Sequence, residues 1–83
     1  MAEILIYTTE ICPYCVRAKA LLDAKKVSYQ ELRVDNDLAL REEMQRLSGK
    51  RSVPQIFINQ KPIGGCDVFF ALEKSGTLDA LLA

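Results

Sequence analysis

Two cysteines three residues apart, Cys12 and Cys15, are the side chains in this sequence best suited to chemistry. The segment Cys12-Pro13-Tyr14-Cys15 stands between an apolar run, Ile4 to Tyr7, and a stretch with helical periodicity. A Cys-x-x-Cys pair beside a strand–helix–strand pattern, in a chain without secretory features, indicates a redox-active dithiol. The pair therefore predicts thiol–disulfide exchange.

Pro13 gives the two cysteines different roles. Proline suits the first position of a helix because its ring fixes φ and its missing N–H has no helical partner there. Cys12 then falls at the N-cap, where free N–H groups and the positive end of the helix dipole favour a thiolate. Cys15 lies one turn further along the same face, within disulfide reach but deeper. We therefore assign Cys12 as the nucleophile and Cys15 as the resolving cysteine.

A structural role for the pair is the alternative. Structural zinc needs four ligands, usually cysteine or histidine, whereas this chain has no histidine and one further cysteine, Cys66. A structural disulfide between Cys12 and Cys15 would constrain the unfolded chain little, because the loop it closes is short. We expect no metal site.

The composition is typical of one small domain. The chain has 83 residues, and 49% of them are hydrophobic, which suffices for a single core. Eleven basic residues balance eleven acidic ones, so no net field attracts nucleic acid or an anionic membrane. We expect a single domain over residues 1–83 that binds no nucleic acid.

The amino-terminal segment and the cysteine count favour the cytoplasm. The apolar run near the amino terminus is too short for a signal peptide and lacks a basic flank, and no segment approaches a membrane span. Three cysteines, two of them close together, do not resemble the disulfide framework of a secreted miniprotein. We expect a reducing, cytoplasmic location and no membrane partner.

Hydrophobic periodicity and turn residues predict the elements that position the dithiol. The first two strands should pair in parallel because a helix connects them, and the last two should form an antiparallel hairpin. In the second helix, Asp37 is the expected N-cap and Gly49 the expected end. The order is β-α-β-α-β-β-α, with strands near 3–7, 29–34, 56–58 and up to 64, helices near 13–26, 38–47 and 67–75, and a final turn at 77–82.

Three motifs together resemble a dithiol glutaredoxin of the small bacterial class. They are Cys12-Pro13-Tyr14-Cys15, Ser52-Val53-Pro54 and Gly64-Gly65-Cys66-Asp67, in this order. The resemblance covers essentially the whole chain. It implies an α/β minimal thioredoxin fold, with a four-stranded mixed sheet flanked by helices.

The resemblance implies a glutathione site beside Cys12. The Val53–Pro54 bond would be cis, and this turn would leave the Val53 N–H and C=O free to bind an extended, peptide-like ligand. Ser52 belongs to the same segment. A proline that merely begins an edge strand is the alternative.

The second half of the implied site lies at residues 64–67. Gly64 and Gly65 would let the backbone N–H groups of Cys66 and Asp67 face a ligand carboxylate at a helix N-terminus. Ionised Asp67 accepts hydrogen bonds, so it would bind the ammonium of the same γ-glutamyl group. Asp67 as an ordinary helix N-cap is the alternative.

A few further residues are assigned roles in the glutathione site only through this resemblance. Tyr14 would flank the ligand sulfur, and Cys66 would contribute its backbone more than its thiol. The candidates for binding the glycine carboxylate of glutathione are Arg41, Lys50 and Arg51, of which we prefer Arg41. A surface role is the alternative for Tyr14 and Arg41. The family often has a lysine shortly before the first cysteine, where this chain has Thr9 and Glu10.

The implied activity is glutathione-dependent thiol–disulfide exchange, with glutathione as co-substrate and no tightly bound cofactor. Partners would be disulfide-bearing or glutathionylated proteins, ribonucleotide reductase among them at the level of the family, and the protein would be a monomer. Two alternatives remain: a redoxin fed by thioredoxin reductase, and a carrier of a glutathione-ligated [2Fe–2S] cluster.

Overall fold

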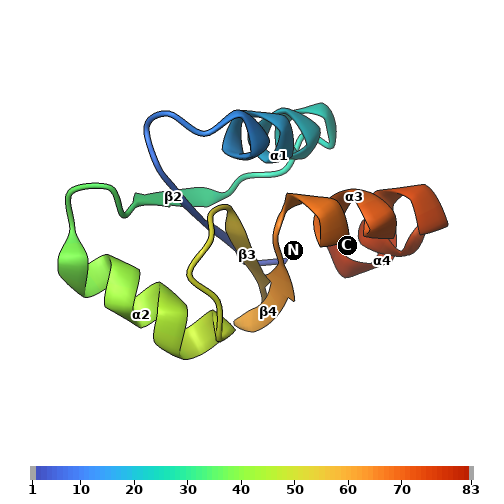
Figure 1. The fold of residues 1–83 in the computed structure, drawn as a ribbon. Helices are drawn as coiled ribbons and strands as arrows, with labels where there is room; N and C mark the ends of the chain where they lie inside the picture. Colours follow the sequence, from blue (N-terminus) through green and yellow to red (C-terminus); the bar gives the residue numbers. More distant parts are fainter. Residues whose placement is uncertain (1, 83) are drawn as a thin grey trace.

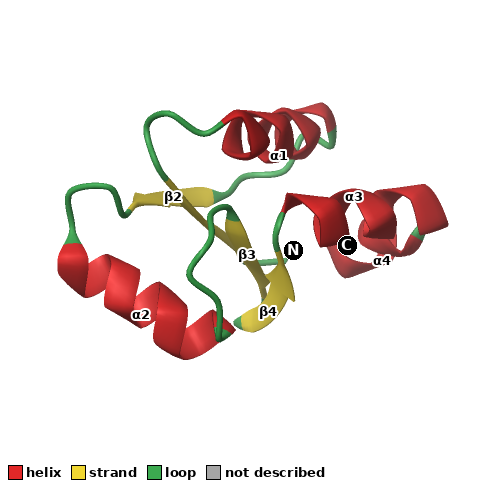
Figure 2. Ribbon diagram, in the orientation of Figure 1, coloured by secondary structure: helices red, strands yellow, loops and turns green. Residues whose placement is uncertain are grey.

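The computed structural model describes residues 2–82, in which four strands form one mixed sheet (Figures 1 and 2). The strand order is β2-β1-β3-β4. The central strand β1 (Ile4–Thr8) pairs in parallel with β2 (Gln30–Arg33) and antiparallel with β3 (Gln55–Ile58). The hairpin partner of β3 is β4 (Lys61–Gly64). The predicted mixed sheet is confirmed.

The helices cover both faces of the sheet. The helix α2 (Leu38–Ser48) lies on one face, and α1 (Pro13–Ala24), α3 (Cys66–Ser75) and α4 (Thr77–Leu82) lie on the other (Figure 1). The alternation of β1 explains this division, because successive side chains point to opposite faces. Ile6 packs in the core of the α1, α3 and α4 face, and Tyr7 packs with Met44 and Phe57 on the α2 face.

The element ends follow the local chemistry that the sequence indicates. The Asp37 carboxylate caps α2 by accepting from the Leu40 N–H at 3.0 Å, and Gly49 ends the helix in the left-handed conformation. The predicted N-cap and end of α2 are therefore confirmed. The first helix ends at Ala24, earlier than predicted, and Lys26 has a positive φ of 58°.

Two further boundaries differ from the expectation. The edge strand β2 is shorter than predicted because its ladder to β1 runs only from Gln30 to Arg33. The expected final turn is a helix, α4, which packs Leu78 and Leu82 into the core. Among residues 2–82, no helix combines the length and the hydropathy needed to cross a bilayer.

Lys25 connects the three helices on one face. Its ammonium lies 2.7 Å from the Glu73 carboxylate of α3 and 2.8 Å from the Asp79 carboxylate of α4. These two contacts, the one with Asp79 more than the one with Glu73, raise the pKa of Lys25 above its ordinary value. The C-terminal end of α1 is thereby held against α3 and α4.

Candidate active site

Cys12 occupies the N-cap of α1, directly after the loop that leaves β1. Its φ of −151° and ψ of 97° are extended, and Pro13 follows at the start of the helix. The Cys12 sulfur accepts a hydrogen bond from the Cys15 N–H at 3.1 Å. The predicted N-cap position is therefore confirmed, and a negative charge on this sulfur would face the positive end of the helix.

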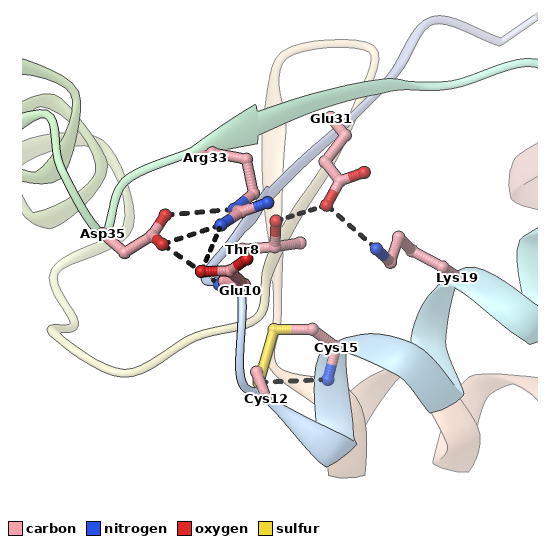
Figure 3. A network of polar contacts seen from close by, with 8 residues as sticks. All are labelled: Thr8, Glu10, Cys12, Cys15, Lys19, Glu31, Arg33 and Asp35. Atoms are coloured by element: carbon pink, nitrogen blue, oxygen red, sulfur yellow. Dashed lines mark hydrogen bonds and ion pairs between the residues drawn. A yellow bond between two sulfur atoms is a disulfide. The ribbon is translucent and has the colours of Figure 1, made fainter.

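Cys15 lies one turn into α1 and forms a disulfide with Cys12 (Figure 3). Their Cα atoms are 5.2 Å apart, as disulfides require. Cys15 is 1% exposed and Cys12 is 9% exposed. This difference supports the assigned roles, because an incoming sulfur reaches Cys12 before Cys15.

Val53 presents an open backbone segment to the Cys12 sulfur. The Val53–Pro54 bond is cis, as the resemblance implies, and the Val53 carbonyl oxygen lies 3.9 Å from the Cys12 sulfur. Among residues 2–82, neither the N–H nor the C=O of Val53 pairs with another backbone group. An extended ligand can therefore add to this segment as a further strand.

Gln55 fixes this segment, although no motif in the sequence points to it. Its side chain is buried, and its amide nitrogen donates to the Ser52 carbonyl oxygen at 2.8 Å and lies 3.3 Å from the Ser52 hydroxyl. A glutamine at the start of the apolar run Gln55–Ile58 was the available signal, since buried polar groups need partners.

Gly65 brings the start of α3 close to the Pro54 segment. It occupies the N-cap of α3, and a Cβ at this position would lie 3.3 Å from the Pro54 carbonyl oxygen and 3.5 Å from an Asp67 carboxylate oxygen. The absence of a side chain leaves room for a ligand beside free helix-end amides.

Asp67 stands in the first turn of α3 with an exposed side chain. The alternative in which Asp67 caps the helix is wrong, because Gly65 occupies the cap and, within residues 2–82, no side chain caps these amides. The Asp67 carboxylate is therefore available to a ligand.

Seven of the predicted site residues line one cleft of about 340 Å³. It lies between the start of α1, the Val53–Pro54 segment and the start of α3. Its lining residues are Tyr14, Ser52, Val53, Pro54, Gly65, Cys66 and Asp67. Arg41 lies on α2 and is not among them, so its contact with glutathione stays a prediction.

Glu10 stands near the nucleophile, but its charge is offset. Its carboxylate lies 3.9 Å from the Arg33 guanidinium, and its N–H donates to Asp35 at 3.3 Å (Figure 3). Arg33 also forms two hydrogen bonds to Asp35, at 2.7 and 3.0 Å, which lower the pKa of Asp35 to about 2. This cluster fastens the loop before Cys12 to the end of β2.

A second polar cluster joins β1, β2 and α1. The buried Thr8 hydroxyl donates to the Glu31 carboxylate, and Lys19 lies 3.0 Å from the same carboxylate oxygen (Figure 3). The Thr8 hydrogen bond, opposed by burial and aided by Lys19, lowers the pKa of Glu31. The segment that carries both cysteines is thus fixed before Cys12 and after Cys15.

Cys66 is a free cysteine on the wall of the cleft. It is 8% exposed, and burial raises the pKa of its thiol, with Arg17 opposing the shift. A protonated, buried thiol reacts slowly. Among residues 2–82, no group of three or more His, Cys, Asp or Glu side chains is arranged to hold a metal ion.

An N-cap cysteine paired with a buried cysteine on this mixed sheet defines a thiol–disulfide oxidoreductase of the thioredoxin-like fold. A family model described as glutaredoxin matches residues 4–63. The chain belongs to the glutaredoxin family.

Bacterial relatives identify the branch of the family. The chain is 58% identical over 82 residues to glutaredoxin 3 of Escherichia coli K12, covering 99% of each sequence. It is 51% identical over 83 residues to a glutaredoxin of Pseudomonas aeruginosa, covering 100% of this chain and 99% of the relative. It is therefore a bacterial glutaredoxin 3-like protein, as the motifs indicated.

Solved structures show the same fold. A buckwheat glutaredoxin–glutathione complex matches with a TM-score of 0.90 at 31% identity, covering 98% of this chain and 76% of that one. The solution structure of glutaredoxin from Brucella melitensis matches with a TM-score of 0.87 at 49% identity, covering 99% of this chain and 89% of that one. The predicted minimal thioredoxin fold is confirmed.

Proposed function

We propose that this glutaredoxin uses glutathione to reduce protein–glutathione mixed disulfides and protein disulfides in the bacterial cytoplasm. The observation that carries the proposal is the cleft beside Cys12, where the open backbone of Val53 and the uncapped start of α3 converge. The two surfaces differ in chemistry, so they recognise different parts of one ligand.

Glutathione fits this pair of surfaces. Its cysteine backbone would pair with the Val53 N–H and C=O, which brings its sulfur to Cys12. Its γ-glutamyl carboxylate would accept from the amides at the start of α3, and its ammonium would contact Asp67. The buckwheat relative was solved as a glutathione complex, which supports this ligand.

Deglutathionylation would use Cys12 alone. Its thiolate attacks the glutathione sulfur of the mixed disulfide, so a Cys12–glutathione bond forms and the protein thiolate leaves. A second glutathione thiolate then attacks the glutathione sulfur held by Cys12. This step releases oxidised glutathione and returns the Cys12 thiolate.

Reduction of a protein disulfide would use both cysteines. Cys12 attacks one substrate sulfur, and the other leaves as a thiolate. Cys15 then attacks the Cys12 sulfur, which releases the second substrate thiolate and leaves the Cys12–Cys15 disulfide observed here. Two glutathione molecules reduce this disulfide and become oxidised glutathione.

The experiment is a coupled assay that follows NADPH oxidation with the mixed disulfide of glutathione and 2-mercaptoethanol. One reaction contains glutathione and glutathione reductase, and the other contains thioredoxin reductase. We expect turnover in the first only. Turnover only in the second would assign the protein as a thioredoxin-type redoxin, and a purified protein with visible iron–sulfur absorption but no turnover would assign it as a cluster carrier.

A further inference from the structure

A second groove adjoins the cleft on the other side of Tyr14 and Asp67. It has a volume of about 340 Å³ and lies between α1 and α3. Its lining residues are Tyr14, Arg17, Cys66, Asp67 and Phe70. Three of these, Tyr14, Cys66 and Asp67, also line the cleft, so the two recesses are continuous.

The chemistry of the groove differs from that of the cleft. Phe70 and Tyr14 expose aromatic surface, 38% and 59% respectively. Both walls belong to helices, so no open strand edge is offered here. The groove therefore suits side chains, whereas the cleft suits a peptide backbone.

Arg17 is the cation of the groove, and the other charged lining residue, Asp67, contacts the glutathione ammonium in the proposed complex. The Arg17 guanidinium carbon lies 5.9 Å from the centre of the Tyr14 ring. Among residues 2–82, no carboxylate lies within ion-pair distance of Arg17. An arginine beside exposed aromatic rings can bind an incoming carboxylate while the rings contact apolar atoms.

We propose that this groove binds the protein part of a glutathionylated substrate, with an apolar side chain against Phe70 and Tyr14 and a nearby carboxylate against Arg17. The inference rests on the proposed function. When glutathione fills the cleft, the protein attached to its sulfur must lie outside it, and the groove is the continuous recess next to it. As Cys12 bonds to the glutathione sulfur, the protein sulfur leaves as a thiolate on this side.

The net charge of the molecule cannot produce a preference for acidic substrates. Basic and acidic residues are equal in number, so the net charge is zero. A preference for acidic substrates must therefore come from a local charge. Arg17 is that charge at this groove, and its effect should be lost when Arg17 alone is reversed.

The test compares two glutathionylated peptides that share one phenylalanine near the modified cysteine. One peptide carries two glutamates beside it, and the other carries two lysines. For the unaltered protein we expect kcat/KM to be about three- to tenfold higher for the acidic peptide, the size of a partly exposed ion pair replaced by repulsion. In Arg17→Glu the peptide ratio, defined as kcat/KM for the acidic peptide divided by kcat/KM for the basic one, should fall below one.

Arg46→Glu is the matched control. Arg46 lies on α2, outside both recesses, and the substitution changes the net charge equally. It should leave the peptide ratio as it is in the unaltered protein. An equal change of the ratio in both variants would show long-range charge rather than a groove and would overturn the proposal.

Phe70→Ala tests the apolar part independently. Replacing the peptide phenylalanine with serine should lower kcat/KM severalfold in the unaltered protein but not in Phe70→Ala.

Peptide ratios that are identical in all variants would overturn the proposal that this groove binds the protein substrate. A raised glutathione KM in Arg17→Glu with an unchanged peptide ratio would also overturn it, because the groove would then serve the second glutathione. Turnover of the 2-mercaptoethanol disulfide by the unaltered protein tests the proposed function separately.

Discussion

The Cys15 backbone N–H donates to the Cys12 sulfur at 3.1 Å, so the resolving residue supports the nucleophile through its main chain as well as its thiol. A substitution of the Cys15 side chain removes the second thiol and leaves this hydrogen bond in place. The two reactions proposed above can therefore be separated by mutation.

Cys15→Ser should retain deglutathionylation and lose the reduction of intramolecular protein disulfides. Cys12→Ser should lose both, because no other thiol occupies the helix N-cap. The measurement is the coupled NADPH assay with a glutathionylated peptide and, separately, with a disulfide-bearing protein. Retained turnover in Cys12→Ser would contradict the assignment of the nucleophile.

Asp67→Ala should raise the KM for glutathione by about tenfold, since a hydrogen bond to a charged group contributes roughly 1.5 kcal/mol. The rate of Cys12 alkylation in the reduced protein should stay the same, because Asp67 does not cap α3 or contact the sulfur. Glu42→Ala, on the exposed side of α2, removes an equal charge away from the cleft. An equal KM shift in both variants would leave Asp67 without a binding role.

Glu31→Gln should destabilise the protein at neutral pH by about 1 kcal/mol, because it removes a charge that Thr8 and Lys19 contact. The folded-state pKa of Glu31 lies below its ordinary value of 4.5. This contribution is therefore fully present above about pH 4.5 and is lost as the pH falls through the folded value.

Urea unfolding of both proteins at pH 7 and at pH 3 measures the effect. The difference in the free energy of unfolding should shrink at the lower pH. A difference that stays constant between the two pH values would mean that the carboxylate charge is not what stabilises this cluster.

Cys66 should resist alkylation at neutral pH while Cys12 reacts. The Cys15→Ser variant keeps only these two thiols, so iodoacetamide labelling followed by mass spectrometry separates them. Because burial raises the pKa of Cys66 above its ordinary value of 9.0, its labelling should increase only in strongly alkaline solution. Fast labelling of Cys66 at pH 7 would show an accessible thiolate instead.

The parts of the site that depend on neighbouring residues in the chain are predictable from the sequence. Cys12 at the N-cap follows from Pro13, and the cap of α2 follows from Asp37. Similarly, Gly49 ends α2 as glycine commonly does. Each of these depends on backbone groups within a few residues.

The polar clusters behind the cysteines depend on how separate elements meet. Lys19 reaches Glu31 only because α1 packs over the β1–β2 pair in this arrangement. Arg33 likewise offsets the charge of the Glu10 carboxylate only because β2 ends beside the loop before Cys12. A sequence shows the charges but neither the register nor the packing that brings them together.

The contacts of Lys25 bear on the α3 wall of the groove. Both α1 and α3 begin at the site, and Lys25 joins the end of α1 to Glu73, late in α3. Phe70 stands three residues before Glu73 on α3, about one helical turn away, so the ion pair holds the turn of α3 that carries the apolar wall of the groove. Dissolved salt screens such exposed charges. We therefore expect the fit of a substrate side chain against Phe70 to depend on ionic strength, although the ion pair takes no part in the sulfur chemistry.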